Sequence, residues 1–276
     1  MTEHRGRVAL VTGGSQGIGL ACAMELSRQG AAVVVHGLES ASTDAAVAQI
    51  TAAGGQALGT VGDIADPAVA ERAVQTAVQG FGRLDTLVTS AGIQRYGDAV
   101  QTTPEEWGRV MAVNVGGTFL ACHFALPELR KCGDGSIVII ASVQATATQT
   151  RVAAYTASKG ALVALARAIA VDEAEHGVRV NSVSPGSVDT PMLRAAAADF
   201  GSNTPEAVEE LIATWGSAHP LGRVARPDEI GAVVSFLAST RSSFITGEDI
   251  RVDGGVLAQL PVTLPERRSD TDGHSQ

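Results

Sequence analysis

The first apolar stretch of the chain ends in a glycine-rich turn, and a helical pattern begins directly after it. Residues 7–12 are rich in β-branched side chains, which predicts a buried strand, and residues 17–29 predict a helix. Strand, turn and helix in this order can hold a pyrophosphate, because glycines allow close approach of the backbone and free N–H groups face the anion. Glycines also serve ordinary tight turns, so the position after the first strand carries the inference. We expect phosphate contacts from Gly13, Ser15, Gln16, Gly17, Ile18 and Gly19.

Strands and helices alternate along the rest of the chain. Apolar runs predict strands at 32–36, 56–62, 86–90, 136–141 and 179–184. Helical patterns predict helices at 42–53, 66–80, 104–130 and 152–176. This alternation predicts right-handed crossovers and a parallel sheet with helices on both faces. Ligands of such sheets bind at the carboxyl ends of the strands, which here carry small or polar residues: Gly13, Gly37, Asp63 and Gly92.

Tyr155 and Lys159 lie four residues apart in the last predicted helix, which places them on one face and one turn apart. The chain has only two tyrosines and two lysines, and one of each is paired here. A tyrosine with its ordinary pKa of about 10 transfers protons poorly at neutral pH unless a neighbouring positive charge lowers that pKa. We therefore expect Lys159 to favour the phenolate of Tyr155. An isolated pair of this kind is more often an ordinary helix surface, so the assignment depends on the rest of the chain.

Length and composition narrow the classes of protein that fit. A chain of 276 residues with 45% hydrophobic residues suits one large α/β domain. The net charge of −9 argues against nucleic acid or an anionic membrane as a partner. Three separated cysteines without a histidine cluster predict reduced thiols and no metal site. The polar start of the chain predicts neither a signal peptide nor a spanning helix, so we expect a cytoplasmic protein.

Six motifs in a fixed order resemble those of the short-chain dehydrogenase/reductase family. They are T-G-x-x-x-G-x-G at 12–19, Asp63 after the third strand, Asn114, Ser142 after the fifth strand, Y-x-x-x-K at 155–159 and P-G-x-V-x-T at 185–190. The resemblance covers residues 7–255. It implies an α/β fold with one Rossmann-like domain, 1–255, whose doubly wound parallel sheet forms the middle of three α/β/α layers. It also implies an NAD(P)-dependent enzyme that moves a hydride between a nicotinamide and a CH–OH group.

The resemblance implies catalytic roles for Asn114, Ser142, Tyr155 and Lys159. Tyr155 would exchange a proton with the substrate oxygen, while Lys159 would lower the pKa of the tyrosine and bind the nicotinamide ribose. Ser142 would hold the reacting oxygen, although a strand-end cap is its simpler interpretation, and Asn114 would order a water path.

The resemblance also implies cofactor contacts beyond the glycine-rich turn and the Tyr155–Lys159 pair. Asp63 would accept a hydrogen bond from the adenine amino group, although a helix cap is its simpler interpretation. Thr190 and the backbone before it would fix the carboxamide of the nicotinamide. The full additional set is Gly37, Leu38, Asp63, Ile64, Ala91, Gly92, Pro185, Gly186, Val188 and Thr190.

Two departures from the family pattern concern the cofactor side. Thr89 and Ser90 stand where many members have two asparagines. At the end of the second strand, many NAD enzymes carry an aspartate that binds the ribose, whereas NADP enzymes carry arginine nearby for the 2′-phosphate. Here Gly37 takes the place of the aspartate, and Glu39 would repel a phosphate. NAD is therefore the favoured cofactor and NADP the alternative, and Gly37→Asp is expected to strengthen the preference for NAD.

Residues 190–220 take the position where the family carries a mobile substrate lid, and 256–276 form a C-terminal segment with a polar tail. We expect substrate contacts from side chains after the fourth and fifth strands and at the start of the lid: Gln94, Arg95, Gln144, Gln149 and Met192. For any one of them a solvated loop position is the simpler interpretation. Together they favour a small polar alcohol, sugar or ketone as substrate.

Two other functions stay open from the sequence. A 3-ketoacyl-thioester reductase would share these motifs, although no basic cluster for a carrier phosphate is evident. A non-catalytic nucleotide-binding protein could keep the fold, although it would not need the proton-transfer group of Tyr155. The resemblance also implies a homotetramer that assembles through the long helices 104–130 and 152–176.

Overall fold

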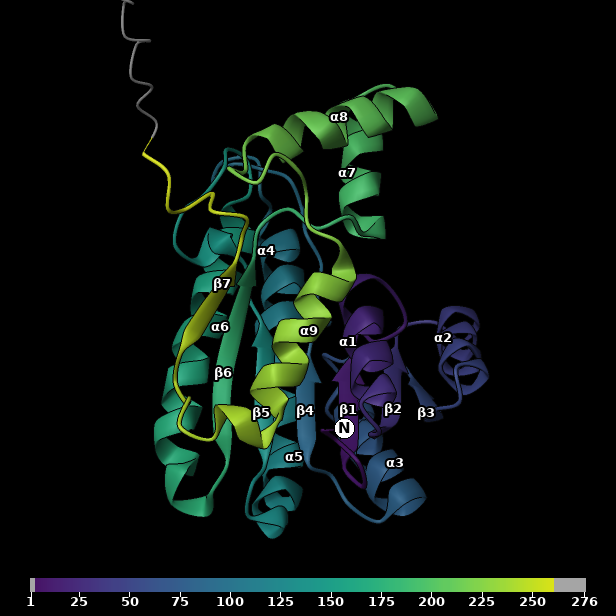
Figure 1. The fold of residues 1–276 in the computed structure, drawn as a ribbon. Helices are drawn as coiled ribbons and strands as arrows, with labels where there is room; N and C mark the ends of the chain where they lie inside the picture. The colour runs from purple at the N-terminus through teal and green to yellow at the C-terminus, as the bar shows by residue number, and fades with distance from the viewer. Residues whose placement is uncertain (1–2, 261–276) are drawn as a thin grey trace, which may run out of the picture.

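The computed structural model describes residues 3–260 and shows a seven-stranded sheet with helices on both faces (Figure 1). The strand order is β3-β2-β1-β4-β5-β6-β7, and every pair of neighbours is parallel. The chain therefore starts in the middle of the sheet, winds to one edge and returns to build the other. The strands are β1 (Val8–Thr12), β2 (Ala32–Gly37), β3 (Gln56–Val61), β4 (Thr86–Thr89), β5 (Ser136–Ile140), β6 (Arg179–Pro185) and β7 (Asp249–Val252).

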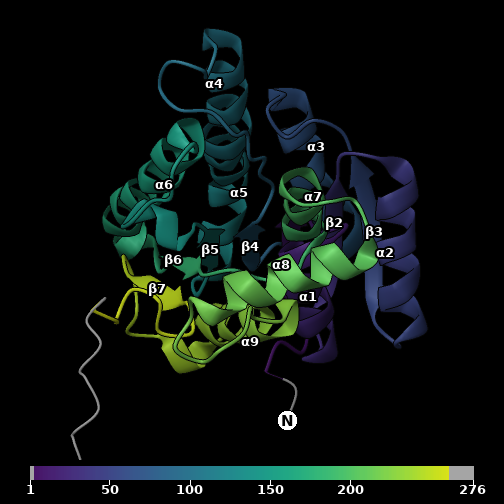
Figure 2. The same cartoon turned by 90° about the horizontal axis from the view of Figure 1, so that it is seen from above.

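The helices lie in two layers, and a further pair stands at the carboxyl ends of the strands (Figure 2). One face of the sheet is covered by α1, α2 and α9, and the other by α3, α5 and α6. The longer helices are α1 (Gly17–Arg28), α2 (Ser40–Ala52), α3 (Pro67–Phe81), α4 (Pro104–Met111), α5 (Gly117–Cys132), α6 (Ala153–Glu173), α7 (Pro191–Phe200), α8 (Pro205–Ser217) and α9 (Pro227–Ala238). This arrangement confirms the predicted α/β fold with a doubly wound parallel sheet.

Two hydrophobic cores hold the layers together, one on each face of the sheet. The core beneath α3, α5 and α6 includes the fully buried Leu10, Leu87, Leu129 and Ile137. The opposite core, beneath α1 and α9, includes Leu26, Val33, Ile230 and Leu237. Strands that are buried on both faces need apolar residues at successive positions, which explains the continuous apolar runs of the sequence.

Two features differ from the sequence-based expectations or add to them. The helix predicted at 104–130 is interrupted by a π-helical turn at Ala112–Gly116. The lid consists of two helices, α7 and α8, and both α9 and β7 were not predicted. The proposed C-terminal segment starts within the structure, but residues 261–276 lie outside the described part of the chain.

The helical stretch Pro104–Cys132 is the one segment among residues 3–260 that is long and apolar enough to cross a membrane. In the structure 44% of its most apolar window is buried, and it packs against α3 and β4. It is therefore a core helix of the α/β layers.

Candidate active site

The glycine-rich turn after β1 packs so closely that side chains would not fit. A Cβ at Gly13, which has a φ of +64°, would lie 2.7 Å from the Cα of Ala91, and a Cβ at Gly19 would overlap the carbonyl oxygen of Gly13. Within the described residues, Gln16 makes no side-chain hydrogen bond to the first turn of α1. The N–H groups at the start of this helix are thus free to face an anion, and the turn fits a pyrophosphate.

The segment Pro185–Thr190 lies beside this turn. A Cβ at Gly17 would lie 3.4 Å from the side chain of Thr190. The Thr190 hydroxyl accepts the N–H of Leu193 at 3.2 Å and so caps α7, the first helix of the lid. Val188 is buried and forms an isolated bridge with Ala225. The turn, the segment and the start of the lid therefore meet at one edge of the sheet.

Asp63 lies at the carboxyl end of β3 and is half-exposed. One carboxylate oxygen accepts the backbone N–H of Ala65 at 3.1 Å, and the other accepts Arg109 of α4 at 2.6 Å. Burial raises the pKa of Asp63, but these two donors outweigh it and leave the pKa below its ordinary value. The carboxylate is therefore ionised at neutral pH and can accept a further hydrogen bond. Arg109 was not anticipated, because only the fold brings α4 to β3.

Two apolar residues that we expected to contact the cofactor differ in exposure. Leu38 follows β2 and is 62% exposed, so it offers an apolar surface. Ile64 is buried with Ala70 and Val113 in a small cluster. Any contribution of Ile64 to nucleotide binding would therefore come from its backbone.

His36 and Thr43 fill the space around the end of β2. The buried His36 lies 3.0 Å through Nε2 from the carbonyl of Gly62, and burial lowers its pKa. Thr43 is fully buried and donates to the carbonyl of Glu39 at 2.8 Å. A Cβ at Gly37 would overlap Oγ1 of Thr43, so the single substitution Gly37→Asp does not fit this structure. The sequence could not show this, because the obstruction comes from α2.

Tyr155 and Lys159 lie one turn apart in α6, as their spacing predicts. The ammonium of Lys159 lies 5.4 Å from the centroid of the Tyr155 ring and donates to the carbonyl of Ile140 at 2.9 Å. Ser142 follows β5, and its hydroxyl accepts the N–H of Gln144 at 3.2 Å. A strand end and a helix thus bring these polar groups together.

The pKa shifts at this site follow from burial. Burial raises the pKa of Tyr155 to about 12, a hydrogen bond with Ser142 opposes that rise, and the nearby Tyr96 adds to it. Burial lowers the pKa of Lys159 to about 8. The pKa of Tyr155 is thus raised, whereas the sequence-based expectation was that Lys159 would lower it. The rise follows because loss of water around the phenol disfavours its charged form. Tyr155 is therefore protonated at neutral pH in this structure.

Asn114 is fully buried in the π-helical turn. Its side chain binds both backbone groups of Ile93 and also donates to the hydroxyl of Ser158 at 3.0 Å. Ser158 in turn donates to the carbonyl of Tyr155 at 2.7 Å. The loop after β4 and the helix that carries the tyrosine are thereby joined through one amide. Ser158 was missed from the sequence because it lies inside the Y-x-x-x-K motif without a conspicuous role.

Among the expected substrate residues, Gln144 lies beside Tyr155, whereas Arg95, Gln149 and Met192 are exposed. Gln144 accepts the hydroxyl of Thr156 at 3.2 Å, which places it next to Tyr155. Arg95 is exposed and folds back on the carbonyl of Gln94, while Gln149 is exposed. Met192, at the second position of α7, is 42% exposed.

An aromatic contact links the lid to the loop after β4. The rings of Tyr96, after β4, and Phe200, at the end of α7, pack edge to face with centroids 4.6 Å apart. Gly97, the next residue after Tyr96, donates to the carbonyl of Arg151 at 2.7 Å, and Arg151 has a φ of +62°. The lid, the loop after β4 and the segment before Tyr155 therefore form one rim.

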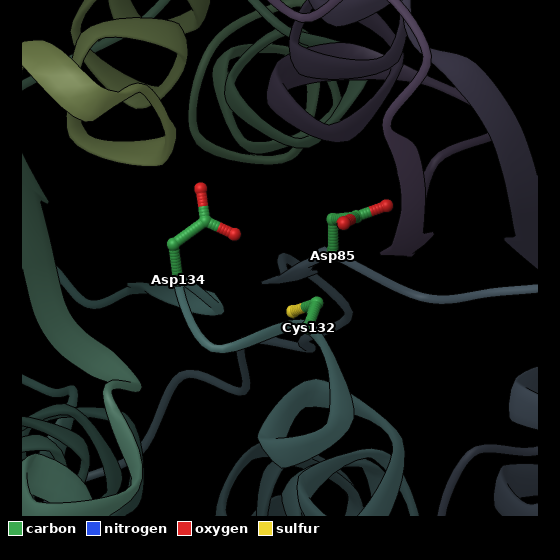
Figure 3. Close-up of side chains that lie close together, drawn as sticks. All are labelled: Asp85, Cys132 and Asp134. Carbon is green, nitrogen blue, oxygen red and sulfur yellow. The ribbon is translucent and has the colours of Figure 1, made fainter.

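Asp85, Cys132 and Asp134 lie together near the amino ends of β4 and β5 (Figure 3). Both carboxylates are already paired, Asp85 with Arg83 and Asp134 with Arg7. These ion pairs explain the cluster without a metal ion, and it lies at the opposite end of the strands from Tyr155. We assign no function to it.

The sheet order and the glycine-rich turn at its switch point are those of a doubly wound α/β nucleotide-binding protein, and the Tyr155–Lys159 pair lies in the helix whose lysine contacts the end of β5. The family described as Enoyl-(Acyl carrier protein) reductase matches residues 13–257. The chain belongs to the short-chain dehydrogenase/reductase family, as its motifs predict, and this membership implies NAD or NADP as cofactor.

Relatives and solved structures match nearly the whole chain. The chain is 41% identical over 251 residues to the short-chain reductase protein NovJ of Streptomyces niveus, covering 90% of this chain and 93% of the relative. It is 36% identical over 250 residues to a D-threitol dehydrogenase of Mycolicibacterium smegmatis, covering 91% and 92%. The ligand-free aldohexose dehydrogenase of Thermoplasma acidophilum superposes with a TM-score of 0.88 at 34% identity, covering 96% and 99%.

Proposed function

We propose that this enzyme interconverts a secondary alcohol and a ketone, or oxidises a sugar hydroxyl, with Tyr155 as the acid/base group. The observation that carries the proposal is the meeting of three segments at Gly92. A Cβ on this glycine would lie 3.4 Å from Oδ1 of Asn114 and 3.9 Å from Nζ of Lys159. The end of β4, the π-helical turn and α6 thus supply groups to one small volume at the carboxyl edge.

The proposed mechanism assigns each proton to a residue. When bound, the nicotinamide supplies or accepts the hydride. In the reducing direction Tyr155, whose pKa of about 12 keeps it protonated, donates its proton to the carbonyl oxygen of the substrate. The hydroxyl of Ser142 holds that oxygen, and the ammonium of Lys159 stabilises the phenolate that remains. In the oxidising direction the phenolate accepts the proton of the alcohol.

NAD is the proposed cofactor. Glu39 supplies a negative charge beside the end of β2, and neither the glycine-rich turn nor residues 36–40 contain a cation. A 2′-phosphate would therefore gain no charge-assisted hydrogen bond from these segments. Leu38 would cover the adenine, and Asp63 would accept from its amino group.

A polar, hydroxylated substrate is proposed from two observations. The rim carries the amide of Gln144, and relatives named for D-threitol and aldohexose cover more than nine tenths of the chain.

Phe119 of α5 and Val171 of α6 are 51% and 78% exposed, which supports the proposed tetramer through these helices. A cytoplasmic location stays a prediction from the sequence.

The test is cofactor reduction, measured with NAD and NADP separately across aldoses, polyols, sugar acids and short hydroxy acids. Tyr155→Phe serves as the blank. A Tyr155-dependent signal with one substrate class supports the proposal. Activity only on 3-ketoacyl thioesters would transfer the assignment to a thioester reductase. Nucleotide binding without turnover of any substrate would favour a non-catalytic protein.

A further inference from the structure

His219 lies two residues beyond α8, is only 5% exposed and has no role in the proposed reaction. Its Nδ1 lies 2.7 Å from the carbonyl oxygen of Asp253, and its Nε2 lies 3.4 Å from the backbone nitrogen of Ser187. A carbonyl only accepts and a backbone N–H only donates, so Nδ1 carries the proton and Nε2 is the acceptor. One imidazole therefore joins the end of the lid, the segment after β6 and the segment after β7.

Glycines allow this imidazole to pack directly on bare backbone. A Cβ at Gly186 would lie 2.6 Å from Cε1 of His219, and a Cβ at Gly254 would lie 3.3 Å from its Cβ. Gly255 packs in the same way on Pro220, the next residue of the chain, at 3.1 Å. Because close-packed atoms cannot interpenetrate, His219 cannot move toward Gly186 without displacing the backbone that leads to Ser187.

An arginine attaches the same segment to the lid at a second point. Arg194 of α7 donates to both carboxylate oxygens of Asp189, at 2.6 and 2.8 Å, and to Glu209 of α8 at 2.7 Å. Such a two-bond pair fixes direction as well as distance. Ser187 and Asp189 flank the buried Val188, so this residue is held on one side by the lid and on the other by His219, which follows the lid.

We propose that His219 is a positioning residue that couples the position of the lid, α7 and α8, to nucleotide binding on the segment Pro185–Thr190. The proposal rests on the proposed function, in which this segment holds the nicotinamide end of the cofactor. Ser187 is held by the residue that follows the lid, and Asp189 by the helix that begins it. A displaced lid must therefore move the segment or break one attachment. By linkage, a nucleotide that favours one position of the segment also favours one position of the lid.

The two tryptophans make the coupling measurable without knowledge of the substrate. Trp215 lies in α8 and Trp107 in α4, so Trp107→Phe leaves a single reporter on the lid. In this background, titration with NADH and with NADPH gives the dissociation constants, and acrylamide quenching of Trp215 reports on the lid. His219→Asn keeps a donor toward Asp253, whereas His219→Gln keeps an acceptor toward Ser187. The pair of variants therefore separates the two hydrogen bonds.

We expect nucleotide to change the quenching of Trp215 in the Trp107→Phe background and in the variant His219→Gln. We expect His219→Asn to bind nucleotide about fivefold more weakly, the loss of about one hydrogen bond, and to abolish the change in quenching. His176→Asn, at an exposed histidine after α6, is the matched control and should behave like the background.

Four results would overturn or redirect the inference. Coupling through His219 is wrong if His219→Asn binds and responds like the background, or if His219→Gln is impaired equally. Nucleotide binding without any change at Trp215 also rejects coupling. A background protein that binds neither NADH nor NADPH rejects the proposed function itself. If circular dichroism shows that His219→Asn does not fold, Arg194→Gln, which cuts the other attachment and leaves His219 in place, must retain the Trp215 response for the proposal to stand.

Discussion

The side-chain amide of Asn114 pairs with the backbone of Ile93 through two hydrogen bonds. Its Oδ1 accepts the N–H of Ile93 at 2.8 Å, and its Nδ2 donates to the carbonyl of the same residue at 3.0 Å. Ile93 lies beyond the end of β4 and has no neighbouring strand to pair with. The amide of Asn114 supplies the two hydrogen bonds that such a strand would make. Because the π-helical turn directs Asn114 to this point, the turn fixes the loop that borders the proposed nicotinamide site.

Asn114→Ala is expected to destabilise the protein and to reduce turnover. The substitution leaves two part-buried backbone groups of Ile93 without their side-chain partner, which costs about 1–3 kcal/mol. Asn181 of β6 is a matched control, because it is equally buried. Its side chain also binds two backbone groups, the carbonyl of Ile245 and the N–H of Glu248, in the segment before β7. Asn181→Ala should lose similar stability in urea unfolding but keep kcat. Equal losses of kcat in the two variants would show that Asn114 is only structural.

Lys159→Met is expected to raise the free energy of unfolding while it lowers activity. The ammonium is buried, and its pKa of about 8 lies below the ordinary value for lysine. Folding therefore disfavours the charged form, and this shift corresponds to ~3 kcal/mol. Part of that is regained by the bond to Ile140, so we expect a net gain of ~1–2 kcal/mol.

The gain has a defined pH dependence. The folded-state pKa is depressed, so the penalty of the lysine is complete below about pH 8 and decreases as the pH rises toward the unfolded value. Denaturant unfolding of the wild-type protein and Lys159→Met at pH 7 and pH 9.5 measures this. An equal or lower stability of the variant at pH 7 would contradict a costly buried ammonium.

How much could be predicted from the sequence depends on the range of the interactions. The glycine-rich turn and the Tyr155–Lys159 spacing are local patterns, and both lie where they were predicted. The π-helical turn was missed because it spans only Ala112–Gly116, a stretch too short for a separate helical period to be recognised in the apolar pattern. Contacts such as Asp63 with Arg109, or His219 with Ser187, join residues far apart in the chain, and no local pattern encodes them.

Oxidation and reduction are expected to respond differently to pH. Because the pKa of Tyr155 is raised to about 12, its protonated form dominates between pH 6 and 9. We therefore expect kcat/KM for reduction to change little up to about pH 8 and to fall above it, where Lys159 loses the charge that stabilises the phenolate. Oxidation needs the phenolate, whose fraction grows about tenfold per pH unit below the pKa. Above about pH 8, Lys159 loses its charge, so the rise should weaken. Profiles in both directions, with Tyr155→Phe as the inactive reference, test this. A flat profile for oxidation would exclude a raised pKa of the tyrosine in the working enzyme.

Cofactor preference should change only when two neighbouring positions change together. Gly37→Asp alone places its Cβ against Oγ1 of Thr43 and 2.9 Å from Cβ of Ser15, so we expect weaker binding of both nucleotides and ~1–3 kcal/mol lower stability. Thr43→Ala removes the closer of these two obstructions, and a small shift of Ser15 then relieves the remaining contact. In the double variant the new carboxylate can accept from the ribose hydroxyls and repel a 2′-phosphate, so the NAD/NADP ratio of kcat/KM should rise about tenfold. Thr43→Ala alone is the control and should leave the ratio unchanged. An unchanged ratio in a folded double variant would mean that the end of β2 does not contact the adenosine ribose.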